Sequence, residues 1–111
     1  MGNKTTDKFV AMIGFATRSG QIVYGLDALK TAKNVRVLAV SDTASDNLKD
    51  GISLLGRRLG IPVIHARSLE ATVGKNVKAL GVTNENMAQE MIRYADASPM
   101  YSTQSVYGGN V

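Results

Sequence analysis

The residue with the clearest potential for binding chemistry is Gly25, which follows a short β-prone run and precedes a short helical segment. A glycine that opens a helix presents free backbone N–H groups and the positive end of the helix dipole. Asp27 adds an acceptor suited to donors on a base edge, and Lys30 and Lys33 follow on the same helix. A second polar and basic group lies further along the chain, at Lys75, Asn76 and Lys78. These residue types suit nucleic-acid binding, and the alternative is that they are scattered solubilising residues.

Residues suited to catalysis are few. The single histidine, His65, lies on or just after an expected strand, where a histidine is usually structural. No carboxylate cluster is visible near it, so the sequence predicts no metal site. Asp42, Asp46 and Asp50 recur at helical spacing beside Ser45, which favours a capped, solvated helix start. We therefore expect no enzymatic activity and no cofactor.

The composition is that of an ordinary globular domain with a basic balance. The chain has 111 residues, 44% hydrophobic, and a net charge of +4 from 13 Lys and Arg against nine Asp and Glu. It has no cysteine, which excludes disulfides, thiolate metal sites and a cysteine nucleophile. The longest apolar run, Phe9 to Ala16, is far short of a membrane span, and the N-terminus lacks the layout of a signal peptide. We expect a cytoplasmic protein with no membrane partner, and a monomer.

Helix and strand signals alternate along the chain. Helical spacing predicts helices over Thr6–Arg18 and Leu26–Lys33, from a Ser45 cap to Leu59, from Ser68 to Gly74, and from an Asn84 cap through Ala95. β-prone runs predict four strands, over Gln21–Tyr24, Val35–Val40, Ile61–His65 and Lys78–Thr83. The alternation predicts a three-layer α/β/α sandwich, a four-stranded mixed sheet with helices on both faces. We expect one domain over residues 1–95 and a flexible tail over 96–111, where Ser, Thr, Tyr, Gly and Asn prevail.

In order and spacing, several of these segments match a known family. They are Ile13–Val23, Gly25, Val37–Ser45, Gly60–Val63, Leu69–Lys75 and Val82–Glu85. The chain resembles the ribosomal protein L-seven-Ae / L-thirty-e superfamily, and within it the small bacterial YlxQ-type members. The likeness runs from about Lys8 to Ile92. It implies the same α/β/α sandwich and a structured RNA partner of the kink-turn kind, with association with the ribosome, another ribonucleoprotein or translation.

The resemblance also implies where the RNA binds. In the family, the helix after the glycine reads guanine edges of sheared G·A pairs, and the loop before the last strand covers a flipped-out base. Carried onto this chain, the first element is Tyr24, Gly25, Leu26, Asp27, Ala28, Lys30 and Thr31. The second element is Val73, Gly74, Lys75, Asn76 and Val77.

The chain departs from the family pattern at three positions of the first element. Asp27, Ala28 and Thr31 stand where strong RNA binders carry Asn or Lys, then Glu or Gln, and Lys. Each lost base contact removes about 1–3 kcal/mol of discrimination, which favours looser binding dominated by phosphate contacts. One alternative is a protein-interaction module on the same fold, with an apolar patch around Leu26. Another is a small-molecule or nucleotide-binding enzyme, which would need a pocket that holds His65 and two carboxylates.

Overall fold

The computed structural model describes residues 8–74, 76–97 and 101–104. They form, in chain order, α1 (Lys8–Arg18), β1 (Ile22–Tyr24), α2 (Leu26–Thr31), β2 (Val37–Ser41), α3 (Asp46–Leu59), β3 (Val63–Ala66), α4 (Leu69–Val73), β4 (Ala79–Val82), α5 (Glu85–Asp96) and β5 (Tyr101–Gln104). Every helix and strand expected from the sequence is present, with ends that differ by a few residues. Ser45 and Asn84 cap α3 and α5 as predicted, because their side-chain oxygens accept hydrogen bonds from the N–H groups of Leu48 and Met87.

The sheet is mixed and has five strands, in the order β1-β4-β2-β3-β5. Strands β2 and β3 run parallel, with Leu38 opposite Val63, and the other neighbours are antiparallel. The expected number of four strands is therefore wrong by one, because β5 adds to the free edge of β3. None of the helices in the described part of the chain is long and apolar enough to cross a bilayer.

The fifth strand corrects the expectation of a structureless tail from residue 96. Helix α5 extends to Asp96, and Tyr101–Gln104 pairs along the whole of β3. Tyr101 is buried and stacks on Phe9 of α1, with ring centroids 4.3 Å apart. Two aromatic rings in contact bury a large apolar area, which offsets the polar character of the rest of the strand. The remainder of the expected tail lies outside the described residues.

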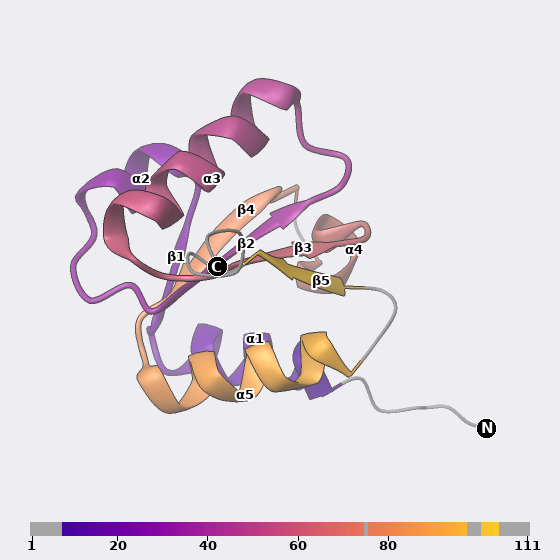
Figure 1. Cartoon of the computed structure of the whole chain (residues 1–111). Helices are drawn as coiled ribbons and strands as arrows, with labels where there is room; N and C mark the ends of the chain where they lie inside the picture. The colour runs from indigo at the N-terminus through magenta and orange to yellow at the C-terminus, as the bar shows by residue number, and fades with distance from the viewer. Residues whose placement is uncertain (1–7, 75, 98–100, 105–111) are drawn as a thin grey trace.

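Two apolar cores lie on opposite sides of the sheet. Alternate residues of β2 point to opposite faces, so that Val37 and Ala39 join one core while Leu38 and Val40 join the other. The first core includes residues of α1, α4 and α5, and the second includes residues of α2 and α3. Figure 1 shows α1 and α5 below the sheet and α2 and α3 above it. Burial on both faces explains why β2 is a continuous apolar run.

The parallel pair gives the sheet two distinct ends. Because β2 and β3 run the same way, both strands begin at one end, here called the amino end, and finish at the other, the carboxyl end. At the amino end, α3 lies close against the start of β3. A Cβ atom on Gly56 would come within 2.7 Å of Val63 Cγ2, so glycine permits this approach. By contrast, β1 and β4 run antiparallel to each other, so β1 ends where β4 begins, at the carboxyl end of β2.

Candidate nucleic-acid interface

The turn from β1 into α2 depends on Gly25. Its φ of 89° and ψ of 148° lie in a region that residues with a Cβ atom rarely adopt, and no neighbouring atom crowds the position. Gly25 is the N-cap of α2 and has no side chain to accept from the first-turn N–H groups. Its carbonyl accepts from the N–H of Leu29, which closes the first turn of the helix. The backbone at the start of α2 is thus capped by no side chain, as the sequence predicted.

The structure brings the two predicted elements together. The N–H of Gly25 donates to the carbonyl of Ala79, the first residue of β4, at 3.0 Å. Tyr24 is the register partner of Leu80, so the end of β1 lies beside the start of β4. The described loop residues Asn76–Lys78 lead directly into β4, which places them next to the glycine turn. We call Tyr24–Thr31 together with Val73, Gly74, Asn76 and Val77 the turn–loop surface.

The predicted site residues differ in how much they can offer a ligand. Six of them are exposed, namely Asp27, Ala28, Lys30, Thr31, Gly74 and Asn76. Five are partly buried, namely Tyr24, Gly25, Leu26, Val73 and Val77, and Lys75 lies outside the described residues. Val73 packs against the core below the sheet. Leu26 faces α3, because a Cβ atom on Gly51 would come within 2.7 Å of Leu26 Cδ2. Leu26 therefore contributes little to an exposed apolar patch.

A hydrogen-bond network fixes the carboxyl end beside this surface. Ser41, the last residue of β2, is fully buried, and its hydroxyl donates to Glu70 Oε1 at 2.7 Å. Thr43 donates to Glu70 Oε2 at 2.6 Å, and the Ser41 hydroxyl also accepts from the N–H of Leu69 at 3.1 Å. The network joins the loop after β2 to the first turn of α4, and α4 leads to Gly74. The sequence predicts that the second strand ends at Val40, one residue before Ser41, and it indicates no role for Glu70. Nothing in their spacing along the chain signals the contact.

The network keeps Glu70 ionised. Hydrogen bonds from Thr43, then from Ser41, then from its own backbone N–H lower the pKa of Glu70 from 4.5 to about 2. The charge of Lys78 acts in the same direction, and its ammonium group donates to the carbonyl of Thr43 at 3.3 Å. Lys78 is therefore a cation at this end of the sheet that is already committed to a protein partner.

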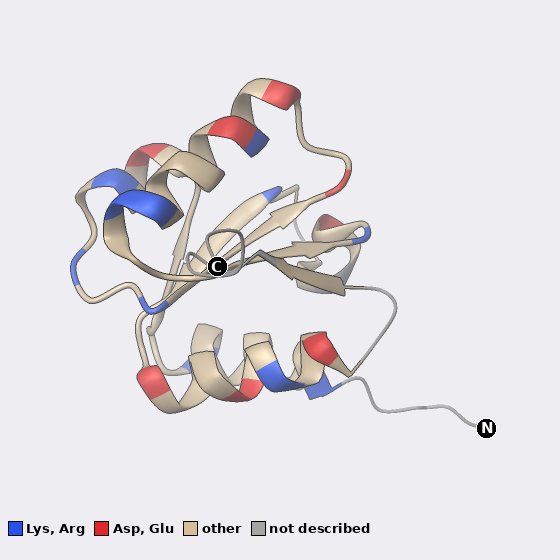
Figure 2. Ribbon diagram, viewed as in Figure 1, with Lys and Arg blue, Asp and Glu red and all other residues tan. Residues whose placement is uncertain are grey.

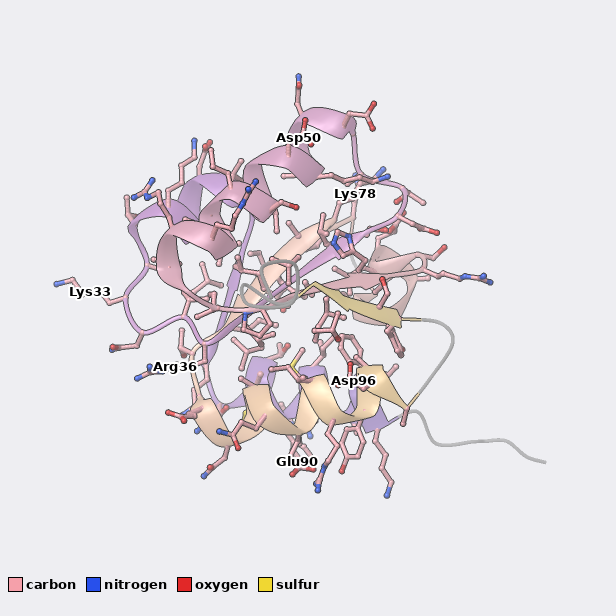
Figure 3. The ribbon with its side chains drawn as sticks, viewed as in Figure 1. Lys33, Arg36, Asp50, Lys78, Glu90 and Asp96 are labelled. Atoms are coloured by element: carbon pink, nitrogen blue, oxygen red, sulfur yellow. The ribbon has the colours of Figure 1, made fainter. Side chains whose placement is uncertain are left out.

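Acidic residues are frequent around the turn–loop surface. Asp27 lies in the first turn of α2, and Asp42 follows β2, where its carboxylate accepts from the N–H of Ser68 at 2.9 Å. Figure 2 shows further acidic positions in the first half of α3, above the carboxyl end of the sheet. In Figure 3 the labelled side chains of Asp50 and Lys78 lie toward this same end. The surface thus carries mixed charge, and its cations are accompanied by carboxylates.

The third hypothesis, an enzyme built around His65, finds no cluster to support it. His65 is partly buried on β3, between its register partners Val40 and Ser102. Among the described residues, no group of three or more His, Cys, Asp or Glu side chains is placed to hold a metal ion. The nearby acids Asp42 and Glu70 are engaged by Ser68 and by the Ser41–Thr43 pair.

Comparison with known proteins defines the class of fold. No protein-family model matches the chain, and no curated protein matches it. Among solved structures, the chain is similar to a Bacillus halodurans protein of unknown function, with a TM-score of 0.71 and 20% identity. The match covers 82% of this chain and 99% of the other. At this level of identity the likeness concerns the fold, an α/β domain with a mixed sheet.

Proposed function

We propose that this protein binds structured RNA through the turn–loop surface, as a three-layer α/β/α sandwich of the L-seven-Ae / L-thirty-e type. The observation that carries the proposal is the 3.0 Å hydrogen bond from the N–H of Gly25 to the carbonyl of Ala79. It joins the glycine turn to the strand that the second loop enters, so one ligand can touch both elements. In this proposal, the protein is cytoplasmic, monomeric and free of cofactors, carries out no catalysis, and associates with the ribosome or another ribonucleoprotein.

The chemistry of the surface favours hydrogen bonding over charge attraction. Exposed polar groups are present at Asp27 and Asn76, and the start of α2 adds main-chain donors. A carboxylate can accept from guanine N1 and N2, as sheared G·A pairs would require, but it repels phosphate. The turn–loop surface is therefore suited to distinguish one RNA shape from another, and poorly suited to hold RNA by charge alone.

The test is a binding titration with two fluorescein-labelled RNA hairpins. One carries a kink-turn in its stem, and the other has the same stem with the sheared G·A pairs replaced by Watson–Crick pairs. We expect both to bind at low salt and the kink-turn hairpin to bind more tightly. Failure to bind either hairpin at low salt would refute the proposed function. Equal binding of the two hairpins would rule out recognition of the kink-turn and leave general RNA binding.

A protein-interaction module is the second candidate function, and Thr31 and Ala28 favour it. The Thr31 hydroxyl donates to the carbonyl of Ala28 at 3.3 Å, so it is engaged within the helix. Ala28 is exposed and has no polar side-chain atom. Two positions that read RNA in the family are therefore unable to do so in the same way here. Co-purification of a protein partner that persists after nuclease treatment, together with absent RNA binding, would establish this alternative.

A further inference from the structure

A group of cations at the amino end of the sheet has not been assigned a role. It comprises Lys33 and Arg36, between α2 and β2, and Arg57 and Arg58, in the last turn of α3, all of them exposed. We call these four residues the basic patch. Lys30, in the last turn of α2, belongs to the turn–loop surface and lies at the end of it that leads to Lys33.

The topology brings the four residues to the same end of the molecule. Leu38 is opposite Val63 in the parallel pair, so the segments that precede β2 and β3 are neighbours. Arg36 immediately precedes β2, and its N–H donates to the carbonyl of Val82. Arg57 and Arg58 precede β3, and the N–H of Ile61 donates back to the carbonyl of Gly56. Figure 2 shows basic positions at the end of α3 and in the segment from α2 to β2, on the left of the view, where Figure 3 labels Lys33 and Arg36.

The cations of the basic patch are unpaired within the described part of the chain. The ion pair found there joins Arg93 to Glu90 on α5, and none of the four side chains of the patch makes an ion pair or a side-chain hydrogen bond. The surrounding sequence is also free of acids. Residues 28–41 and 51–69 contain six of the thirteen Lys and Arg and none of the nine Asp and Glu. The nearest acids along the chain are Asp27 at the start of α2 and Asp50 in the first half of α3. A further acid, Glu85, is the first residue of α5, which follows β4, the antiparallel neighbour of β2.

We infer that the basic patch binds the phosphate backbone of the RNA whose shape is recognised at the turn–loop surface. This inference rests on the proposed function. Helix α2, which is part of the turn–loop surface, has six residues and is therefore about 9 Å long, so this surface extends along the helix toward Lys33. Strand β2, with five residues, separates the carboxyl and amino ends by about 17 Å. An RNA stem that leaves the turn–loop surface along α2 passes Lys30 and reaches the patch within that distance.

A continuous chain of phosphates fits this arrangement better than other anionic partners. Phosphates spaced along a stem match cations spread over the ends of α2 and α3, and each contact releases a bound counterion. Arginine and lysine side chains that form no ion pair within the described part of the chain suit that role. An anionic membrane or an acidic protein would touch the patch without requiring the turn–loop surface. The two surfaces would then act independently, and the experiment below separates that case.

The experiment compares two variants that lose the same charge in different places. Arg57→Gln/Arg58→Gln removes half of the patch. Arg18→Gln/Arg93→Gln removes two exposed arginines from α1 and α5, below the sheet. Binding of the kink-turn hairpin and the matched plain hairpin is measured over a range of salt concentrations, with circular dichroism to confirm folding. We expect the patch variant to bind both hairpins more weakly by the same factor. Its slope of log affinity against log salt should be shallower by about 1.5, since each phosphate contact contributes about 0.7–0.9. The control variant should keep the wild-type slope.

Each outcome decides the inference. Wild-type binding with equal slopes for the two variants would overturn the role of the patch and leave the proposed function intact. Wild-type failure to bind either RNA would overturn both. Two further probes, phosphatidylserine vesicles and polyglutamate, test the other partners. If the patch variant loses binding to either of them while its RNA titration matches that of the control variant, the patch serves a membrane or an acidic protein.

Discussion

The two ends of the sheet use polar residues in opposite ways. At the carboxyl end, Ser41, Thr43 and Glu70 satisfy one another with short hydrogen bonds, and Lys78 donates to the carbonyl of Thr43. At the amino end, the four cations of the basic patch have no partner in the described part of the chain. A satisfied network fixes geometry, whereas unpaired cations leave charge available. Under the proposed function, the carboxyl end would recognise the shape of the RNA and the amino end would attract its phosphates, the two tasks that nucleic-acid binders combine.

The largest expected effect comes from breaking the network at the carboxyl end. Ser41→Ala removes a fully buried hydroxyl and leaves the N–H of Leu69 without its acceptor. We expect a loss of about 3 kcal/mol in the free energy of unfolding, near the upper limit for one unsatisfied buried group in a network. Urea denaturation followed by circular dichroism measures it, with Ser102→Ala, at an exposed position of β5, as the control. A loss as small as that of the control would show that the network does not stabilise this end.

The next effect concerns the backbone of the glycine turn. Gly25→Val places a β-branched residue at a φ of 89°, where no atom lies within 4 Å of an added Cβ, so we expect a cost that is mainly conformational. We expect about 2 kcal/mol of destabilisation and a loss of preference for the kink-turn hairpin. Gly20→Ala, at a φ of 70° away from the proposed surface, is the control for stability. If the valine variant keeps its RNA preference, the turn is not part of the binding surface.

A pH titration tests the network without changing its shape. Because the pKa of Glu70 is lowered in the folded protein, the stability that its ionised form contributes is complete above about pH 4.5. It is lost as the pH falls from there toward about 2. Glu70→Gln should therefore lower the unfolding free energy near neutral pH, and the gap to the wild type should close in this acidic range. A gap that stays constant from pH 7 to pH 2 would contradict the assignment. Other carboxylates, such as Glu90, titrate in both proteins, so the difference between them isolates Glu70.

The smallest expected effect comes from a single charge on the turn–loop surface. Asp27→Asn removes an exposed negative charge from the first turn of α2 with little change of shape. We expect tighter binding of the plain hairpin, by up to about fivefold at low salt, from an interaction of about 0.2–1 kcal/mol. Preference for the kink-turn should fall at the same time, because an amide presents one acceptor oxygen where the carboxylate has two. Asp96→Asn, at the end of α5, should change neither quantity.

Much of the fold follows from local signals in the sequence. The apolar run that became β2, the caps at Ser45 and Asn84, and the glycine stop at Gly60 each act over a few residues. Such signals depend only on the types of neighbouring residues, and they predicted the helices, the first four strands and the mixed α/β arrangement correctly. Helical spacing predicts that Leu48, Ile52, Leu55 and Leu59 of α3 all face inward. Leu59 does not, because it lies in the last turn and remains 42% exposed.

The features that the sequence did not reveal depend on distant contacts. The Ser41–Glu70 hydrogen bond joins residues 29 positions apart, and β5 is polar apart from Tyr101. Neither has a periodic pattern, since their stability comes from partners that the fold supplies. The same holds for the basic patch. In the sequence, Arg57 and Arg58 are two surface charges far from Lys33 and Arg36. The parallel pairing of β2 and β3 brings all four to the same end of the sheet. The meeting of the glycine turn with the second loop was implied by a family resemblance, and spacing alone did not predict it.

The stacking of Tyr101 on Phe9 has a consequence for how the protein is made. Phe9 belongs to the first described helix and Tyr101 to the last described strand, so nearly the whole chain must leave the ribosome before the two rings can meet. Until then, the outer edge of β3 is bare and can pair with another nascent chain. We expect the final step of co-translational folding to be the docking of β5. A chain that stops at Ala97 keeps the other nine described helices and strands but lacks β5. We therefore expect it to self-associate through the uncovered edge of β3.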